Sequence, residues 1–397
     1  MNNEPITLDP TQFLPDDGFA GTLMARIWSP GVPGGPSVAM LRDDGVHDLS
    51  ASFATMSGLL DQPEPAAAAR AATSQRVCSL AELHNSSSGR RDPARPFLLA
   101  PCDLQVVKAA GVTFATSLVE RVIEEKAGGN AARAQAVRAS VQAALGHDLA
   151  ALRPGSPEAM ALKALLQQQG MWSQYLEVGI GKDAEVFTKA PVLASVGSGD
   201  DIGIRRDSVW NNPEPEVVLA VSSRGRIVGA ALGNDVNLRD IEGRSALLLG
   251  KAKDNNASCA IGPFIRLFDA SFGLDDVRRE TVHLHVQGPE GYQLRGINTM
   301  ASISRDPLEL VEQTMAAHQY PDGFMLFLGT LFAPIEDRDQ PGSGFTHKLG
   351  DVVSIRSARL GELLNRVTHC EAAPPWQFGL RAFIDNLARR GLLSNPT

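Results

Sequence analysis

Three carboxylates in one short stretch are the residues of this chain best suited to chemistry. Glu214, Glu216 and Asp235 lie in the sequence NPEPEVVLAVSSRGRIVGAALGNDVNLRD. Both halves of this stretch are apolar and rich in β-branched residues, and Arg224-Gly225 between them suits a two-residue turn, because glycine adopts a positive φ at little cost. The stretch therefore predicts a β-hairpin.

The pairing of this hairpin brings the three carboxylates together. With the turn centred as above, Glu214 lies opposite Asp235, and Glu216 shares the face of Glu214 because strand side chains alternate at period two. Three like charges at such short range repel unless a cation lies among them, and all-oxygen ligands suit Mg²⁺, with Mn²⁺ or Ca²⁺ as alternatives. A solvated strand face with salt-bridge partners is the other interpretation, but it does not require the rigid backbone that Pro213 and Pro215 impose.

The composition of the chain changes near residue 95. Residues 19–50 alternate short apolar runs with Gly and Pro turns, residues 62–94 are rich in Pro, Ala, Ser and charge, and Asn85–Asp92 (NSSSGRRD) has the composition of a loop or linker. We therefore expect a small β-rich N-terminal domain over residues 1–95 and a catalytic domain over residues 96–397.

The second domain is predicted to mix strands with helices laid outside a sheet. Residues 118–169 have apolar residues at helical spacing, with breaks at Gly128-Gly129 and Pro154-Gly155, and short strands dominate from about residue 175 to 300. A helix over residues 307–317, a buried strand over 324–332 and an amphipathic helix over 376–393, ending at a glycine, follow. The pattern indicates a mixed, β-rich α+β fold with peripheral helices.

Composition narrows the class of partner. The chain of 397 residues has a net charge of −8 and a pI near 5.6, without a basic stripe interleaved with aromatic residues, so a nucleic-acid partner is not expected. The acidic N-terminal segment lacks the pattern of a signal peptide, and the longest apolar run is too short to cross a bilayer. We expect a cytoplasmic protein that has no membrane partner and acts on a small molecule. Its cysteines show no metal-binding or disulfide spacing: Cys78, Cys102, Cys259 and Cys370.

Several motifs resemble the fumarylacetoacetate hydrolase superfamily over roughly residues 100–370. The PEPE and GNDVNLRD elements, and Lys253 followed by Gly262-Pro263, occur in the order and spacing of that superfamily. Within it, SQYLEV, WNNPEPEVV, GRSALLL, KAKDNNASCAIGPF, HQYPDGF and GFTHKLGD are most similar to bacterial 2-keto-3-deoxypentonate dehydratases. The resemblance implies a β-roll catalytic domain around a buried divalent metal, usually Mg²⁺, in a homodimer or homotetramer.

The resemblance also assigns roles to residues. The metal ligands of the family correspond to Glu214, Glu216 and Asp235, the three that the hairpin pairing selects independently. Glu185, which begins the element EVFTK, corresponds to a fourth ligand or a general acid/base; the alternative is an exposed strand carboxylate. Lys253 corresponds to a cationic residue near the metal, where a lowered pKa would let it act as a base.

Further residues are expected to contact the substrate. The resemblance places Arg239 near the metal, where it holds a substrate oxygen, and Thr330 where a hydroxyl touches the substrate. Asn255 either contacts substrate hydroxyls or caps a turn, and Thr346 lies on a glycine-rich return near the expected site. Lys189, at the end of EVFTK, is a third candidate for the base, beside Lys253 and Glu185.

These parts are consistent with elimination of water from a 2-keto acid. A chelated metal would make the C3 protons of a 2-keto-3-deoxypentonate acidic, so that the C4 hydroxyl leaves as water. With 2-keto-3-deoxy-D-xylonate or an arabinonate relative, the expected product is 2-oxoglutarate semialdehyde, in non-phosphorylative pentose breakdown. The expected enzyme is thus a lyase, a sugar-acid dehydratase.

Two alternatives remain. The same chelate serves a C–C bond hydrolase that cleaves a 2,4-diketo acid and releases pyruvate, but hydrolases of the superfamily commonly activate water with a His-x-x-Glu dyad. Ser117 stands here at the position of that histidine, with Glu120 after it, and this favours the dehydratase. A non-enzymatic sensor on the same scaffold is disfavoured, since binding alone would not require Glu185 and Lys253 beside the ligands.

Overall fold

The structure is a computed structural model that describes most of the chain. The described residues are 12–88, 91–145, 149, 152–168, 170, 172–340 and 344–393. The acidic start of the chain (residues 1–11) and residues 89 and 90 of the expected linker lie outside these ranges.

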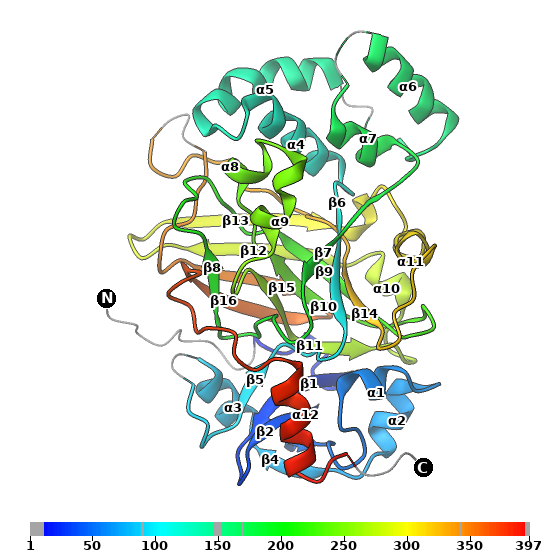
Figure 1. Cartoon of the computed structure of the whole chain (residues 1–397), viewed down its shortest axis with the longest axis vertical. Coiled ribbons are helices and arrows are strands. Elements are labelled where there is room, and N and C mark those ends of the chain that lie inside the picture. The colour runs from blue at the N-terminus through cyan, green and yellow to red at the C-terminus, as the bar shows by residue number, and fades with distance from the viewer. Residues whose placement is uncertain are drawn as a thin grey trace.

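One large sheet forms the framework of the described chain (Figure 1). Its strands follow the order β4-β3-β2-β1-β11-β10-β9-β14-β6-β7, and β5 also pairs with β1. All neighbours are antiparallel except β14 and β6. The strands are β1 (Thr22–Ser29), β2 (Gly35–Arg42), β3 (Gly45–Asp48), β4 (Gln75–Cys78), β5 (Phe97–Leu99), β6 (Val106–Gly111), β7 (Glu185–Ala190), β9 (Pro215–Val221), β10 (Ile227–Asp235), β11 (Cys259–Leu267) and β14 (Phe324–Phe327).

A second sheet packs on the middle of the first. Its order is β13-β12-β15-β16-β8, with β8 (Asp201–Ile204), β12 (Thr281–Gln287), β13 (Gln293–Thr299), β15 (Val352–Ser357) and β16 (Gly361–His369). Val217 and Leu219 of β9 belong to the core shared with this sheet, whereas Val218 and Ala220 belong to the core on the opposite face. Because both faces of β9 are buried, its sequence after Glu216 is a continuous apolar run, residues 217–221.

Helices lie around the sheets. The helices α4 to α7 form a layer at one end of the molecule, and α1, α2, α3 and α12 lie near the other end (Figure 1). Their bounds are α1 (Met56–Leu60), α2 (Pro65–Ala71), α3 (Leu80–Ser87), α4 (Ala115–Ala127), α5 (Ala131–Leu145), α6 (Pro157–Gln168), α7 (Gln174–Ile180), α8 (Arg239–Glu242), α9 (Leu249–Lys253), α10 (Leu274–Val277), α11 (Pro307–Met315) and α12 (Leu380–Arg389).

The expected helices are confirmed, and some boundaries are corrected. The break at Gly128 is a left-handed C-cap of α4 with φ +63°. The expected strand over residues 324–332 ends at Phe327, because Gly329 has φ +100° and turns the chain toward the carboxylates. The helix expected from residue 376 begins at Leu380, and the first residues of the expected linker, Asn85–Ser87, belong to α3.

The division near residue 95 stays a prediction, and the pairing of β1 bears on it. Thr22 and Leu23 pair with Leu267 and Arg266 of β11, so the N-terminal strands extend the same sheet as the hairpin strands β9 and β10. The fold is the expected mixed α+β arrangement, with the β-rich N-terminal part joined to the remainder by main-chain hydrogen bonds.

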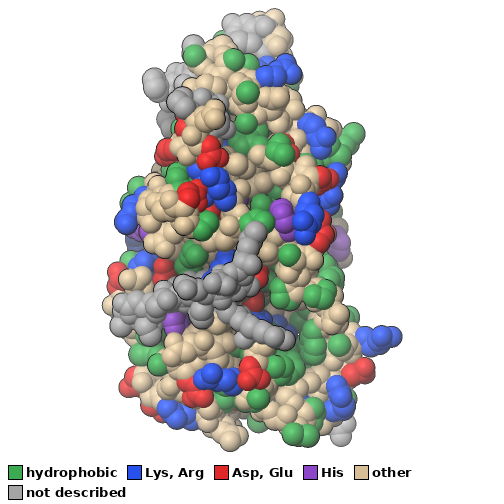
Figure 2. Space-filling view, turned by 90° about the vertical axis from the view of Figure 1, so that its left-hand side faces the viewer, with side chains coloured by type: hydrophobic (Ala, Val, Ile, Leu, Met, Phe, Trp, Pro, Cys, Tyr) green, Lys and Arg blue, Asp and Glu red, His purple; other side chains and the backbone are tan. Residues whose placement is uncertain are grey.

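No helix among the described residues is long and apolar enough to cross a membrane. Figure 2 shows one face of the molecule, on which Lys and Arg side chains are interspersed with Asp and Glu. The described side chains visible on that face form no continuous basic surface of the kind that nucleic-acid backbones require.

Candidate metal centre

The hairpin of β9 and β10 has the expected register at its open end. Glu216 pairs with Gly233, and the Asp235 amide donates to the Glu214 carbonyl at 3.0 Å, so Glu214 and Asp235 lie opposite each other. Glu214 immediately precedes β9 and Asp235 is the last residue of β10, which places their carboxylates beside one another.

The turn of the hairpin differs from the expected two-residue turn. The Ser222 amide donates to the Arg226 carbonyl at 2.9 Å, which leaves a three-residue loop with Gly225 at φ +76°. Pairing is therefore offset by one residue at Val221 and Ile227, and a bulge before Gly229 removes the offset. The predicted pairing of the carboxylates holds because the two irregularities cancel.

The three predicted ligands converge in the protein interior. One oxygen of each of Glu214, Glu216 and Asp235 lies within 4.8 Å of the others, and each residue is at most 2% exposed. Glu216 is fixed by the turn after β14: the Gly329 amide donates to Oε2 at 2.7 Å and the Thr330 hydroxyl to Oε1 at 3.3 Å.

Two buried lysines lie against the cluster. Lys253, the last residue of α9, has its Nζ 2.5 Å from Glu214 Oε2 and 3.0 Å from Asp235 Oδ2. Lys189, in β7, has its Nζ 2.7 Å from Asp235 Oδ1 and donates to the Lys253 carbonyl at 2.5 Å. The predicted Lys189 and Lys253 are thus brought together at one ligand, Asp235.

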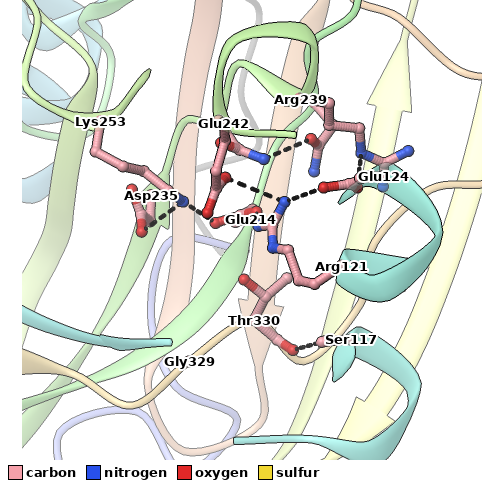
Figure 3. A network of polar contacts seen from close by, with 12 residues as sticks. Ser117, Arg121, Glu124, Glu214, Asp235, Arg239, Glu242, Lys253, Gly329 and Thr330 are labelled. Carbon is pink, nitrogen blue, oxygen red and sulfur yellow. Dashed lines mark hydrogen bonds and ion pairs between the residues drawn. The ribbon is translucent and has the colours of Figure 1, made fainter. Parts of the chain in front are cut away.

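A second layer of charges comes from α4 and α8 (Figure 3). Arg121 of α4 forms ion pairs with Glu214, with Glu124 at 2.6 Å and with Glu242 of α8 at 3.1 Å. Arg239 Nε lies 3.1 Å from Glu124 Oε1. Sequence reasoning did not select Arg121, Glu124 or Glu242.

A signal for two of them exists in the sequence. Ser117, Arg121 and Glu124 follow each other at spacings of four and three, which places them on one face of a helix. All three are buried. Polar residues on the buried face of an otherwise amphipathic helix indicate a polar site beneath that helix.

The electrostatics of the cluster differ from one carboxylate to the next. Burial would raise the pKa of Glu214, but Arg121 and Lys253 outweigh it and lower that pKa to about 2. Burial, with the charges of Asp235 and Glu214, raises the pKa of Glu216 well above its ordinary value. The negative charges of the other two carboxylates therefore disfavour the ionised form of Glu216.

The charge count of the site fits a divalent cation. With all groups ionised, the six carboxylates of Glu124, Glu185, Glu214, Glu216, Asp235 and Glu242 face the four cations of Arg121, Lys189, Arg239 and Lys253. Two negative charges are left without a counterpart. A buried all-oxygen cluster with this excess fits a hard cation such as Mg²⁺, held by Glu214, Glu216 and Asp235.

Glu185 is half-buried at the start of β7, opposite Gly111 of β6. Burial, together with the charge of Glu242, raises the pKa of Glu185 to about 7, although Arg121 and Lys253 act to lower it. A carboxyl group with this pKa exchanges protons near neutral pH, which an exposed strand carboxylate would not do.

The expected lowering of the Lys253 pKa depends on a bound metal and stays a prediction. Burial alone would lower this pKa, but Asp235 and Glu214 outweigh burial and hold the pKa of Lys253 above its ordinary value. A metal that takes over these two acids would remove the contribution that raises it.

Two predicted substrate contacts lie away from the metal ligands. Asn255 donates from Nδ2 to the Lys251 carbonyl at 2.9 Å and accepts from Arg205 at 3.2 Å, which favours the turn-capping alternative. The Thr346 hydroxyl donates to the Val209 carbonyl at 3.3 Å and accepts from the Asn211 amide at 3.2 Å.

Arg239 and Thr330 lie nearer to the centre. Arg239 is buried in the second layer, donates to the Pro334 carbonyl at 2.9 Å and lies over the Trp210 ring. Thr330 contacts Glu216 directly. The substrate-contact roles of Arg239, Thr330, Asn255 and Thr346 all stay predictions.

The two residues at the positions of the hydrolase dyad, Ser117 and Glu120, bond to other partners. Ser117 Oγ donates to the Thr330 carbonyl at 2.5 Å, which ties α4 to the turn that holds Glu216. Glu120 pairs with Arg138 of α5. Neither side chain forms a water-activating pair in the described structure.

The fold and the site define a class of protein with packed mixed sheets around a buried carboxylate metal centre. Residues 163–368 match the family described as "Fumarylacetoacetate (FAA) hydrolase C-terminal". This match covers more than half of the chain, and the chain belongs to the fumarylacetoacetate hydrolase family.

Two relatives are similar over about half of the chain. A protein of Haloferax volcanii named "Probable 2-keto-3-deoxyxylonate dehydratase" is 32% identical over 202 residues, 51% of this chain and 66% of its own length. The 2-dehydro-3-deoxy-D-arabinonate dehydratase of Saccharolobus solfataricus is 31% identical over 186 residues, 46% of this chain and 58% of its own length. The matches thus span less than two thirds of either relative.

Solved structures share the fold over most of the chain. A 2-keto-3-deoxyarabinonate dehydratase has a TM-score of 0.61 at 21% identity, covering 87% of this chain and 98% of its own. A 2-keto-3-deoxy-D-arabinonate dehydratase complexed with magnesium and 2,5-dioxopentanoate has a TM-score of 0.60 at 20% identity, covering 88% and 99%. At these identities the likeness concerns the fold.

Proposed function

We propose that this protein is a metal-dependent dehydratase that converts a 2-keto-3-deoxypentonate, such as 2-keto-3-deoxy-D-xylonate or an arabinonate relative, to 2-oxoglutarate semialdehyde. The observation that carries the proposal is the buried cluster of Glu214, Glu216 and Asp235 with two lysines against it and a proton-exchanging carboxyl, Glu185, nearby. The dehydratase names of the two relatives support the same substrate class.

The metal is proposed to be Mg²⁺, which when bound supplies Lewis-acid polarisation of the keto acid. Glu214, Glu216 and Asp235 are its ligands, and Gly329 and Thr330 orient Glu216 among them. Mn²⁺ or Ca²⁺ would satisfy the same oxygen donors.

Glu185 is proposed to move the protons. Its pKa of about 7 lets the carboxylate take a proton from C3 and pass it to the C4 hydroxyl, which leaves as water. In the tautomerisation that follows, the proton removed from C5 returns at C3, and the proton of the C5 hydroxyl returns at C4. Lys253 and Lys189 form ion pairs with Asp235, and from there they attract the substrate carboxylate into the buried site.

The contacts of Ser117 favour elimination over the alternative, hydrolysis of a 2,4-diketo acid. Hydrolysis needs a base that activates water. The position of that base is occupied here by Ser117, whose hydroxyl donates to the Thr330 carbonyl. Elimination expels water and needs no such base.

The experiment that tests the proposal measures product masses. Purified protein with Mg²⁺, with and without a chelator, is incubated with D- and L-2-keto-3-deoxypentonates and with a 2,4-diketo acid. Metal-dependent loss of one water, giving 2-oxoglutarate semialdehyde, is expected. Release of pyruvate from the diketo acid alone would identify the C–C hydrolase instead.

A homodimer or homotetramer and a cytoplasmic location belong to the same proposal. The first rests on the family resemblance, and the second on the names of the relatives, which are those of metabolic enzymes. Light scattering of the purified chain measures the first, and fractionation of cells that express it measures the second.

A further inference from the structure

Arg121 has more carboxylate partners than its charge can balance. Its guanidinium contacts Glu214, Glu124 and Glu242, and all four residues are buried (Figure 3). Only Glu214 among the three acids is a proposed metal ligand. Arg121 therefore bridges the metal centre and a pair of acids that lie outside it.

Both oxygens of Glu214 are held by cations. Arg121 is paired with Oε1 and Lys253 with Oε2. A divalent cation at Glu214 is repelled by both, and buried like charges repel strongly because the surroundings screen them little. Binding therefore requires that at least one of these cations give up part of its hold on Glu214.

Arg121 is the cation that can do so at small cost. If it leaves Glu214, it keeps Glu124 at 2.6 Å and Glu242 at 3.1 Å. Lys253 is paired with Glu214 and Asp235, both of them proposed ligands, so it has no acid outside the centre among its ion pairs in the described structure.

We propose that Arg121 is a positioning residue that acts as a metal-displaceable counter-ion. It neutralises Glu214 when the metal is absent, and Glu124 and Glu242 retain it when the metal binds. Because Arg121 belongs to α4, which shares a core with α7, metal occupancy is coupled to how firmly this helix is held on the site. The inference rests on the proposed metal centre.

The first test is Mg²⁺ titration of Arg121→Met by calorimetry, without substrate. Removal of the competing cation is expected to tighten Mg²⁺ binding by roughly 10-fold. Arg138→Met, which removes the pair of α5 with Glu120, is the matched control and should leave the affinity unchanged. Unchanged or weaker binding by Arg121→Met overturns the proposal.

A second test covers the case in which Arg121→Met does not fold. Glu242→Gln removes one of the acids that retain Arg121, so Arg121 stays on Glu214 and Mg²⁺ should bind several-fold more weakly. If Glu242 acted on the metal only through its own charge, the loss would be as large in the Arg121→Met background. The proposal requires a smaller loss there.

Hydrogen exchange of the wild-type protein gives a readout that needs no variant. Mg²⁺ is expected to speed exchange of the α4 amides, because the helix loses its bond to Glu214. Slower or unchanged exchange with Mg²⁺ bound overturns the coupling. Failure of the wild-type protein to bind Mg²⁺ at all would instead refute the proposed metal centre, which keeps the two failures distinguishable.

Discussion

At the scale of single residues, each carboxylate of the candidate metal centre is held by partners of its own. Glu216 is held by a main-chain amide and a hydroxyl, whereas Glu214 and Asp235 are held by cations. Neutral donors orient a ligand without repelling a metal, so Glu216 is the ligand most available to one. Burial and the charges of Asp235 and Glu214 raise the pKa of Glu216, so a positive charge at this carboxylate would be strongly favoured.

Substitution of this ligand tests the metal assignment. Glu216→Gln keeps the shape and, with its amide oxygen at the position of Oε2, the bond from the Gly329 amide, while its NH2 group donates to the Thr330 hydroxyl. Because it removes the charge, we expect turnover to fall by more than about 100-fold with the fold retained. Turnover at saturating Mg²⁺ and circular dichroism measure the two effects. Glu158→Gln, at an exposed helix position, is the control. Unchanged turnover by Glu216→Gln would refute the assignment.

Gly111 determines where the Glu185 carboxylate lies. A Cβ at this position would lie 1.9 Å from Glu185 Oε2, so Gly111→Ala must push the carboxylate aside while the main chain remains in place. We expect turnover to fall about 10-fold or more, since displacement of an acid/base group by about 1 Å has such effects. Steady-state kinetics measure it.

The control for this substitution is Gly273→Ala, where an added Cβ meets no atom within 4 Å. It should leave turnover unchanged. Full activity of Gly111→Ala would show that Glu185 does not carry out the proton transfer.

The raised pKa of Glu185 predicts a pH dependence of stability. The unfolded carboxyl ionises near 4.5 and the folded one near 7, so the folded state binds the extra proton in this window and loses stability as the pH rises through it. Glu185→Gln has no such loss. With a chelator present, the free energy of unfolding of Glu185→Gln relative to that of the wild type should therefore rise by roughly 1–3 kcal/mol between pH 4 and pH 8. Denaturant unfolding at both pH values measures the gain, and a loss would contradict the assignment.

At the scale of elements, α4 and the turn after β14 together form one wall of the site. Ser117 of α4 holds the Thr330 carbonyl, while Gly329 and Thr330 hold Glu216. The helix therefore acts on Glu216 through a turn that is more than 200 residues away from it in sequence, as the separation of 213 between Ser117 and Thr330 shows. Buried apolar residues of α4 and α7 pack in one core, so the two helices are held together.

Ser117→Ala separates a structural role of α4 from a chemical one. Loss of one buried hydrogen bond should lower the free energy of unfolding by about 1 kcal/mol, with turnover reduced by no more than a few-fold. Thermal unfolding and kinetics report the two quantities. A loss of activity of the size expected for Glu216→Gln would mean that Ser117 takes part in the chemistry, as the hydrolase alternative requires.

At the scale of the whole molecule, the N-terminal part and the hairpin share one sheet. Met24, Val38 and Leu59 pack in the same core as Val218 and Ala231. Burial of this surface, together with the pairing of β1 with β11, indicates that the division near residue 95 is one of composition more than of folding.

A chain that begins at residue 96 tests this view. It would expose the edge of β11 and the apolar face of the hairpin, so we expect it to aggregate or to unfold without a cooperative transition. The full chain under the same conditions is the comparison. A soluble product that still binds Mg²⁺ would establish residues 1–95 as a separate domain.

The sequence alone was sufficient for the hairpin and its three carboxylates. A period of two and a central glycine fix which strand residues share a face, and this local rule survived a change of turn type because a bulge compensated for it. The helices of residues 118–169 were equally local, since their glycine and proline breaks act within one turn of chain.

Only the tertiary structure decided which charged side chains surround those carboxylates. Lys189, Arg121 and Glu242 come from β7, α4 and α8, and no spacing relates them to the hairpin. Their effect depends on burial and on distances across elements: at Lys253 the acids of the site outweigh burial and raise the pKa. Local periodicity determines the ligands, and long-range packing determines the charge that surrounds them.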